Sequence, residues 1–128
     1  MKLDFDMQQV FKTFWKNVTL HAQSAKIFAH RGLSSTLLSS LLYKGASTYD
    51  FIYLDGSHTQ RDTLIDLTLS MLLIKKGGII IIDDYLNRMA TDDPLLRPKD
   101  AVDFVVKSFG NEVDFSLTPQ KQAVIIRK

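Results

Sequence analysis

The sequence predicts an α/β fold with a mostly parallel sheet, helices on both faces and a terminal antiparallel hairpin. Three observations lead to this prediction. Apolar runs rich in β-branched and aromatic residues alternate with segments of helical period. Residues 79–82 form an isoleucine run without polar alternation, which is typical of a strand covered on both faces. Two final apolar runs, at residues 112–117 and 123–126, flank a turn at Pro119.

The first half of the chain is expected to form two helices and one strand. Apolar side chains recur with helical spacing from residue 11 to residue 18, which indicates an amphipathic helix. Residues 25–29 form a short apolar run that predicts a strand. Ser34 and Ser35 follow, and both are good N-cap residues for a second helix that carries four leucines.

The second half is expected to contain two further strands, two helices and the hairpin. A strand at residues 49–54 ends at Asp55, and Thr59 begins the spacing of a capping box for the next helix. Lysines and glycines at residues 75–78 should stop that helix, and Pro98 opens the last one. In the helix that Thr59 begins, the expected buried residues are Leu64, Leu67, Met71 and Leu72.

Composition excludes several classes of protein. A chain of 128 residues with 45% hydrophobic residues fits one domain over residues 1–128. The net charge of +2 is dispersed, so neither a nucleic-acid nor a membrane partner is expected. The absence of cysteine excludes a disulfide scaffold and a cysteine nucleophile. No apolar segment fits a secretory signal or a bilayer span, so we expect a cytoplasmic protein.

Carboxylates follow two strands at the edge where α/β sheets bind their ligands. Asp55 follows one strand, and Asp83 and Asp84 follow the next. Three neighbouring carboxylates repel one another unless a proton or a cation intervenes. Oxygen ligands with no cysteine and one nearby histidine favour Mg2+ or Ca2+. His58 lies close to Asp55 in sequence and could accept the proton of a metal-bound hydroxyl, because histidine titrates near neutral pH.

The same residues also permit structural roles. Asp83 or Asp84 could cap the end of a strand, and Asp55 could belong to an ordinary turn. His58 could be a hydrogen-bonded structural histidine, and Ser34 a helix cap. A phosphoacceptor receiver domain also clusters acids at strand ends, but there the acidic pair precedes the acceptor aspartate, and this chain has the opposite order.

Three segments of the chain resemble one known family. They read YDFIYLDGSH at residues 49–58, LLIKKGGIIIIDDY at residues 72–85 and PKDAVDF at residues 98–104. Together they resemble class I S-adenosylmethionine-dependent methyltransferases of the metal-assisted O-methyltransferase type. The resemblance implies a Rossmann-like sheet, S-adenosylmethionine and Mg2+ as cofactors, and methyl transfer to a hydroxyl of a small-molecule substrate.

The resemblance also implies roles for individual residues. It makes Asp55, Asp83 and Asp84 metal ligands and His58 the catalytic base. In such enzymes the residues that match Gly32 and Ser34 lie near the adenine of the cofactor, and Asp55 is expected to lie near the cofactor as well.

The resemblance covers the C-terminal part of that fold. The methyl donor is held there mainly by a glycine-rich turn after strand 1 and an acid after strand 2, and no such segment precedes Met1. We therefore expect strands 1 and 2 of the family fold to be missing. Either the strands at residues 25–29 and 49–54 pair directly, giving about five strands, or a second subunit supplies the missing surface.

Two functions remain open at this point. The first is a methyltransferase that needs a lost N-terminal segment or a homo-oligomeric partner, and is inactive as this chain without them. The second is a non-catalytic remnant that acts as an oligomeric or interaction domain. Substrate choice would depend on the loop at residues 86–97.

Overall fold

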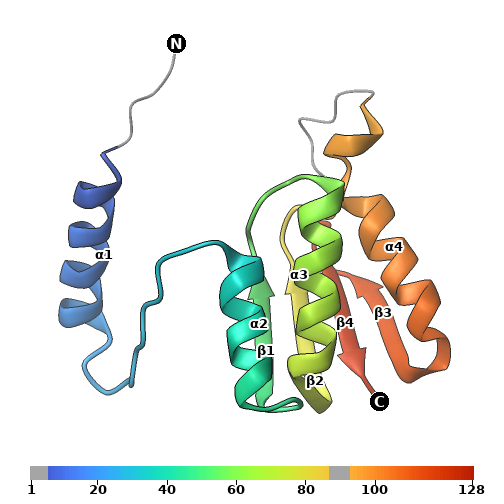
Figure 1. Ribbon diagram of the computed structural model, residues 1–128, viewed down its shortest axis with the longest axis horizontal. Coiled ribbons are helices and arrows are strands. Elements are labelled where there is room, and N and C mark those ends of the chain that lie inside the picture. The colour runs from blue at the N-terminus through green and yellow to red at the C-terminus, as the bar shows by residue number, and fades with distance from the viewer. Residues whose placement is uncertain (1–5, 87–92) are drawn as a thin grey trace. The chain divides into compact units, whose positions relative to one another are not determined.

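The computed structural model describes residues 6–86 and 93–128 of the chain (Figure 1). They fall into two compact units, Met1–Arg31 and Gly32–Lys128. Residues 87–92, part of the loop expected to determine substrate choice, lie outside the described residues. The single domain expected from composition stays a prediction.

The first unit contains helix α1 (Met7–His21), which confirms the predicted amphipathic helix. Asp6 caps this helix, because its carboxylate accepts hydrogen bonds from two backbone amides of the first turn. Aromatic rings contact one another along one side, and the ring centroids of Phe14 and Trp15 lie 5.5 Å apart. Helix α1 is thus fixed at its first turn and carries an aromatic stripe.

The second unit contains a four-stranded sheet in the order β1-β2-β4-β3. Strands β1 (Tyr49–Leu54) and β2 (Ile74–Ile82) are parallel, whereas β4 (Ala123–Arg127) runs antiparallel to β2 and to β3 (Val113–Leu117). The α/β class and the terminal hairpin are confirmed. The sheet is mixed rather than mostly parallel, because only one helical crossover joins strands that are neighbours in the sheet.

The strand predicted at residues 25–29 is wrong. These residues form neither helix nor strand, and Phe28 is 73% exposed. A strand needs a neighbour for its backbone N–H and C=O groups, and β1 pairs only with β2 among the described residues. The direct pairing expected between residues 25–29 and 49–54 is therefore wrong as well. Completion of the sheet by a second subunit stays a prediction.

Three helices form one layer on one face of the sheet (Figure 1): α2 (Ser34–Lys44), α3 (Gln60–Leu73) and α4 (Pro98–Phe109). Helix α3 lies between the other two and contacts both. The connections from β1 to β2 and from β2 to β3 advance across the sheet in the same direction, so right-handed crossovers place α3 and α4 on the same side. Helices were predicted on both faces of the sheet, but among the described residues of this unit they cover only one face.

The two faces of the sheet differ in burial. Successive side chains of a strand point to opposite faces. In β2, Ile80 is fully buried on the helix side, whereas Ile81 is only partly buried on the other side. In β1, Phe51 and Tyr53 on that second face are 53% and 47% exposed. This second face of the sheet is apolar and partly aromatic. Among the described residues of this unit, no helix covers it.

Helix α3 supplies the centre of the core. Leu67 and Met71 are fully buried, as predicted, and Leu64 is partly buried. Leu72 is 43% exposed, so its predicted burial is wrong. Because α3 packs against the sheet and against a helix on each side, its buried arc includes Thr63, Asp66 and Ser70 instead. The core cluster consists of Leu67, Met71, Ile74, Ile80, Ile82, Tyr85, Val102, Val105, Val113, Ala123 and Ile125.

The chain passes from α3 into β2 without a separate loop. Thr59 caps α3 as predicted, since its Oγ1 accepts the backbone N–H of Asp62 across 3.2 Å. The glycine pair expected to stop the helix lies inside β2. Gly77 has a φ of +80°, and a Cβ on Gly78 would lie 2.7 Å from Cγ1 of Ile74. Glycine is required at both positions for these reasons.

Arg127 ties the last strand to this junction. Its guanidinium donates to the carbonyl oxygens of Met71 and Ile74 across 3.1 and 2.9 Å. These carbonyls lie where the helix ends, so they lack helical partners. None of the helices in residues 6–86 and 93–128 is long and apolar enough to cross a membrane.

A buried carboxyl group lies between α2 and α3. The hydroxyl of Ser34 donates to Oδ2 of Asp66 across 2.7 Å, and Oδ1 of Asp66 has no partner among the described residues. Asp66 is 6% exposed, and its burial raises the pKa of its carboxyl group, an effect that the Ser34 bond partly opposes. Leu33 occupies the N-cap position of α2 without a side-chain cap bond, so the predicted capping role of Ser34 is wrong.

Leu67→Ala should destabilise the chain by about 2–5 kcal/mol, because it leaves a cavity at the centre of the core. Leu72→Ala on the same helix is the matched control and should cost less than half as much, since Leu72 is partly exposed. The free energy of unfolding in urea measures both. Equal losses would contradict the orientation of α3 described above.

Asp66→Asn should change how stability depends on pH. In the folded chain Asp66 keeps its proton above the ordinary pKa of 3.8, whereas the unfolded chain loses it. Raising the pH through this interval therefore favours unfolding. Asparagine removes the ionisation and keeps an acceptor for Ser34, so the decline in unfolding free energy from low to neutral pH should become shallower. Asp50→Asn, an exposed control, should leave the decline unchanged, and an unchanged slope in Asp66→Asn would refute the assignment.

Candidate functional site

The carboxyl ends of β1 and β2 lie side by side because the strands are parallel. Leu54, the last residue of β1, pairs with Ile82, the last residue of β2. The backbone N–H of Asp83 donates to the carbonyl oxygen of Leu54 across 3.0 Å, which extends the pairing by one step. The loop that begins at Asp55 and the turn at residues 83–86 consequently leave the sheet at the same edge.

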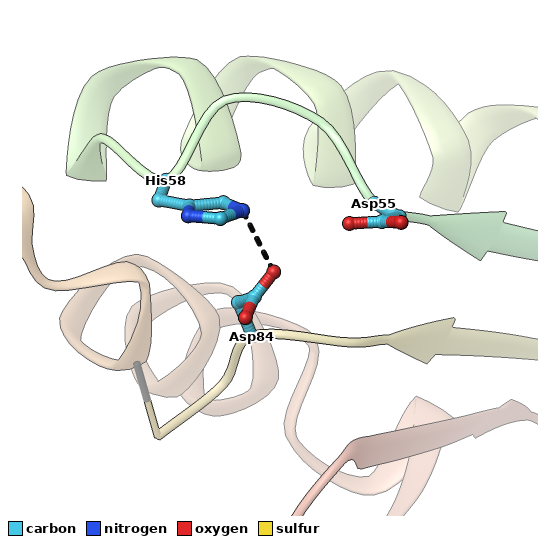
Figure 2. A group of neighbouring side chains, drawn as sticks. All are labelled: Asp55, His58 and Asp84. Carbon is cyan, nitrogen blue, oxygen red and sulfur yellow. Dashed lines mark ion pairs between the residues drawn. The ribbon is translucent and has the colours of Figure 1, made fainter. Parts of the chain in front are cut away.

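Three side chains meet at this edge: Asp55, His58 and Asp84 (Figure 2). One candidate ligand atom from each lies within 4.8 Å of the others. The Nε2 atom of His58 is 2.7 Å from Oδ2 of Asp84, and the two side chains are 47% and 31% exposed. A cation or a substrate can therefore reach this group from solvent.

Asp83 is not one of these three residues, and its side chain binds other partners. The hydroxyl of Tyr53 donates to Oδ1 of Asp83 across 2.6 Å, and the side-chain amide of Gln122 donates to the same atom. These two bonds, together with the nearby His58, lower the pKa of Asp83, and the bond to Asp83 raises the pKa of Tyr53 to about 12. Of the three predicted carboxylates, the structure thus brings together Asp55 and Asp84, but not Asp83.

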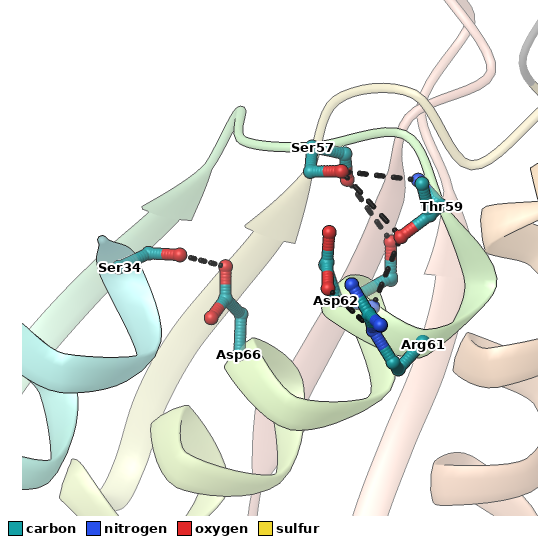
Figure 3. Close-up of polar contacts among 7 residues, drawn as sticks. Ser34, Ser57, Thr59, Arg61, Asp62 and Asp66 are labelled. Atoms are coloured by element: carbon teal, nitrogen blue, oxygen red, sulfur yellow. Dashed lines mark hydrogen bonds and ion pairs between the residues drawn. The ribbon is translucent and has the colours of Figure 1, made fainter.

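Ser34 and Asp66 line a pocket of about 470 Å3 near the N-terminal ends of α2 and α3 (Figure 3). This volume falls in the range of small-molecule sites. Gly32 is not among its lining residues, and its φ of +154° favours glycine for backbone reasons. Asp55 instead lines a cavity of about 20 Å3, which has room for one water. The other residues that line the larger pocket are Leu33, Ser35, Ser57, Arg61, Asp62 and Ile65.

Hydrogen bonds stiffen the rim of this pocket (Figure 3). The guanidinium of Arg61 donates to Asp62 across 3.0 Å, and the backbone N–H of Thr59 donates to Ser57 Oγ across 3.4 Å. A hydrogen bond with Ser57 is the largest of the effects that lower the pKa of Asp62, followed by that from Arg61. The loop that carries His58 is thereby joined to the first turn of α3.

A second, larger groove of about 790 Å3 lies between α3, α4 and the short 3-10 helix η1 (Pro94–Leu96). Its walls are mainly apolar, and Leu95 and Phe104 are 66% and 62% exposed. Part of the loop expected to govern substrate choice therefore borders this groove. The lining residues are Thr59, Gln60, Arg61, Leu64, Asp93, Leu95, Leu96, Asp100, Ala101 and Phe104.

Sequence reasoning missed three residues of the site. Asp66 is an acid within the apolar arc of α3, and that position was a usable signal for a buried carboxyl group. Tyr53 lies among apolar residues of β1 and therefore looks like a structural strand residue. Its position two residues before Asp55 was the only sequence signal of a role in the site. Gln122 precedes β4 and comes to the site through strand pairing, for which the sequence carries no signal.

The arrangement offers two kinds of chemistry. Two carboxylates and an imidazole within 4.8 Å form a donor set that fits a divalent cation. The contact between His58 and Asp84 also fits proton transfer, since a carboxylate beside an imidazole orients the ring and stabilises its protonated form.

Comparison with known proteins agrees with this picture. Residues 3–85 match the family described as a methyltransferase domain. A Dictyostelium discoideum protein named "Probable caffeoyl-CoA O-methyltransferase 1" is 42% identical over 62 residues, which are 48% of this chain and 26% of that protein. "Probable caffeoyl-CoA O-methyltransferase 3" of the same organism is 38% identical over 80 residues, which are 60% of this chain and 31% of that protein. The chain thus spans about a quarter to a third of the length of these curated relatives.

Solved structures share the fold. A crystal structure of a Corynebacterium glutamicum protein superposes with a TM-score of 0.62 at 13% identity, over 94% of this chain and 55% of that one. The SAH-bound methyltransferase PaMTH1 of Podospora anserina gives a TM-score of 0.66 at 15% identity, over 94% and 57%. Because the family match extends over more than half of the chain, the protein belongs to the methyltransferase domain family.

Proposed function

We propose that this chain forms the metal-binding and acceptor-binding part of an S-adenosylmethionine-dependent O-methyltransferase, which acts with Mg2+ on a hydroxyl of a small molecule. The observation that carries the proposal is the convergence of Asp55, His58 and Asp84 at the carboxyl edge of the sheet. The names of the relatives, which are O-methyltransferases, support the reaction class.

Asp55 and Asp84 would hold the cation. The family resemblance implies Asp83 as a third carboxylate, but its Oδ1 accepts hydrogen bonds from Tyr53 and Gln122 instead. Mg2+ prefers carboxylate oxygens and keeps part of its water shell, which suits an exposed group. Oδ2 of Asp84 contacts His58, so Oδ1 is the atom that can turn to a cation. Mg2+ at this position would make a bound substrate hydroxyl easier to deprotonate.

His58 would act as the base that takes this proton through a ring nitrogen. Its side chain is about half exposed, so a substrate hydroxyl can approach it. Asp84, at 2.7 Å, orients the imidazole and stabilises its positive charge after proton transfer. The deprotonated oxygen would then attack the methyl carbon of S-adenosylmethionine, whose bond to sulfur would break to leave S-adenosylhomocysteine.

The pocket of about 470 Å3 would receive the adenine end of S-adenosylmethionine. Leu33 and Ile65 offer apolar contact to a flat ring, and Ser34 and Ser57 offer polar atoms. Further contacts to the cofactor would come from an N-terminal segment or from a second copy in a homo-oligomer. The chain spans about a quarter to a third of the length of these relatives.

A non-catalytic interaction domain is the second candidate. One observation favours it: the second face of the sheet is apolar, with Phe51 and Tyr53 about half exposed. Contiguous apolar surface of this kind commonly marks a protein interface. In this case the chain would oligomerise or bind a partner protein without binding the methyl donor.

Titration calorimetry with S-adenosylmethionine should separate the two candidates. Binding in the range of 1 mM or tighter, weakened by Ser34→Ala and unaffected by Ser39→Ala on the same helix, would support the methyltransferase. Ser39 is a matched control because its hydroxyl donates to the backbone of its own helix. No heat change at about 1 mM would favour the interaction domain.

Mn2+ binding, followed by electron paramagnetic resonance as a substitute for Mg2+, should depend on the acidic group. Asp55→Asn and Asp84→Asn should each weaken Mn2+ binding by roughly tenfold or more, because each removes a charged ligand. Asp50→Asn, an exposed acid on the same strand as Leu54, should leave it unchanged. Equal affinity in all variants would refute the metal site.

A further inference from the structure

Three polar side chains connect three strand ends beside the metal group. Tyr53 comes from β1, Asp83 follows β2, and Gln122 precedes β4. Both donors bind Oδ1 of Asp83, and the amide of Gln122 also lies 3.1 Å from the hydroxyl of Tyr53. We call this closed triangle of hydrogen bonds the Asp83 clamp.

The clamp is fixed by the sheet. The Cα of Tyr53 pairs with that of Ile81, and Ile81 pairs with Val124, so the three strands are in register immediately before their polar ends. The backbone N–H of Gln122 donates to Thr118 across 3.1 Å, which holds the turn that presents the amide. The donors therefore arrive at Asp83 on a rigid scaffold.

Asp83 and Asp84 consequently have different partners although they are adjacent in sequence. Asp84 contacts His58, whereas Oδ1 of Asp83 accepts two hydrogen bonds from the clamp. A carboxylate that joins a cation must give up or share such bonds. The cluster of candidate ligands within 4.8 Å accordingly contains Asp55, His58 and Asp84, and Asp83 stands outside it.

We propose that Tyr53 and Gln122 are positioning residues that hold Asp83 out of the metal group and so weaken the binding of a divalent cation. In the clamped state the group offers the cation two carboxylates, those of Asp55 and Asp84. Release of Asp83 adds a third carboxylate. The inference rests on the proposed metal site and adds that its affinity is set by residues that do not touch the cation.

Two variants of the 128-residue chain test this by electron paramagnetic resonance of Mn2+. Tyr53→Phe removes one donor to Asp83 and should tighten Mn2+ binding by about threefold to tenfold, the factor that corresponds to the net contribution of one typical hydrogen bond. Tyr53→Phe combined with Gln122→Met removes both donors and should tighten it further. Tyr49→Phe is the matched control, on the same strand, and should change nothing.

Asp83→Asn identifies the origin of the gain. In the otherwise unchanged chain it should alter Mn2+ affinity by less than about twofold, because Asp83 is held away from the cation. In the Tyr53→Phe chain it should abolish the gain. Weaker Mn2+ binding in Tyr53→Phe would overturn the inference, since Tyr53 would then support a ligand rather than restrain it.

The clamp also has a readout without a cation. The 13Cγ resonance of Asp83 should shift in Tyr53→Phe and stay in place in Tyr49→Phe, and an unchanged resonance would overturn the inference. Mn2+ binding that depends on Asp84 but not on Tyr53 would contradict this inference alone. Failure of every chain to bind Mn2+ would contradict the proposed metal site together with it.

Discussion

The parallel pairing of β1 with β2 is the constraint on which the site depends. Parallel neighbours end at the same edge, so the acids that follow Leu54 and Ile82 must meet there. If these two strands were antiparallel, the acids that follow them would lie at opposite ends of the strands. The crossover through α3 makes the parallel pairing possible, and the buried face of that helix keeps it in place through Leu67 and Met71.

The two consecutive acids of the turn after β2 then take different partners. Asp83 binds Tyr53 of β1, and Asp84 contacts His58. The consequence is a group of mixed donors in place of three equivalent carboxylates. The site therefore combines a contact suited to proton transfer with ligands suited to a hard cation.

Helix α3 both packs against the sheet and lines the pocket beside α2. Helix α3 presents Leu67 to the sheet, and on its flank toward α2 it buries Asp66, which binds the hydroxyl of Ser34. The pocket assigned to the cofactor in our proposal thus lies over a buried acid, whose ionised form is costly in this position. Stability of the α2–α3 contact and the shape of that pocket are consequently linked.

The sequence by itself determined the local elements and the identity of the acids. Periodicity, the Thr59 cap and Pro98 marked the helices, and the strand that ends before Asp55 was explicit, because these signals act within a few residues. It failed at residues 25–29, since a short apolar run forms a strand only where a neighbouring strand accepts it. Long-range pairing carries no local signal, so only the tertiary structure decided that all helices of this unit share one face, that Gln122 reaches Asp83, and that Asp83 leaves the group formed by Asp55, His58 and Asp84.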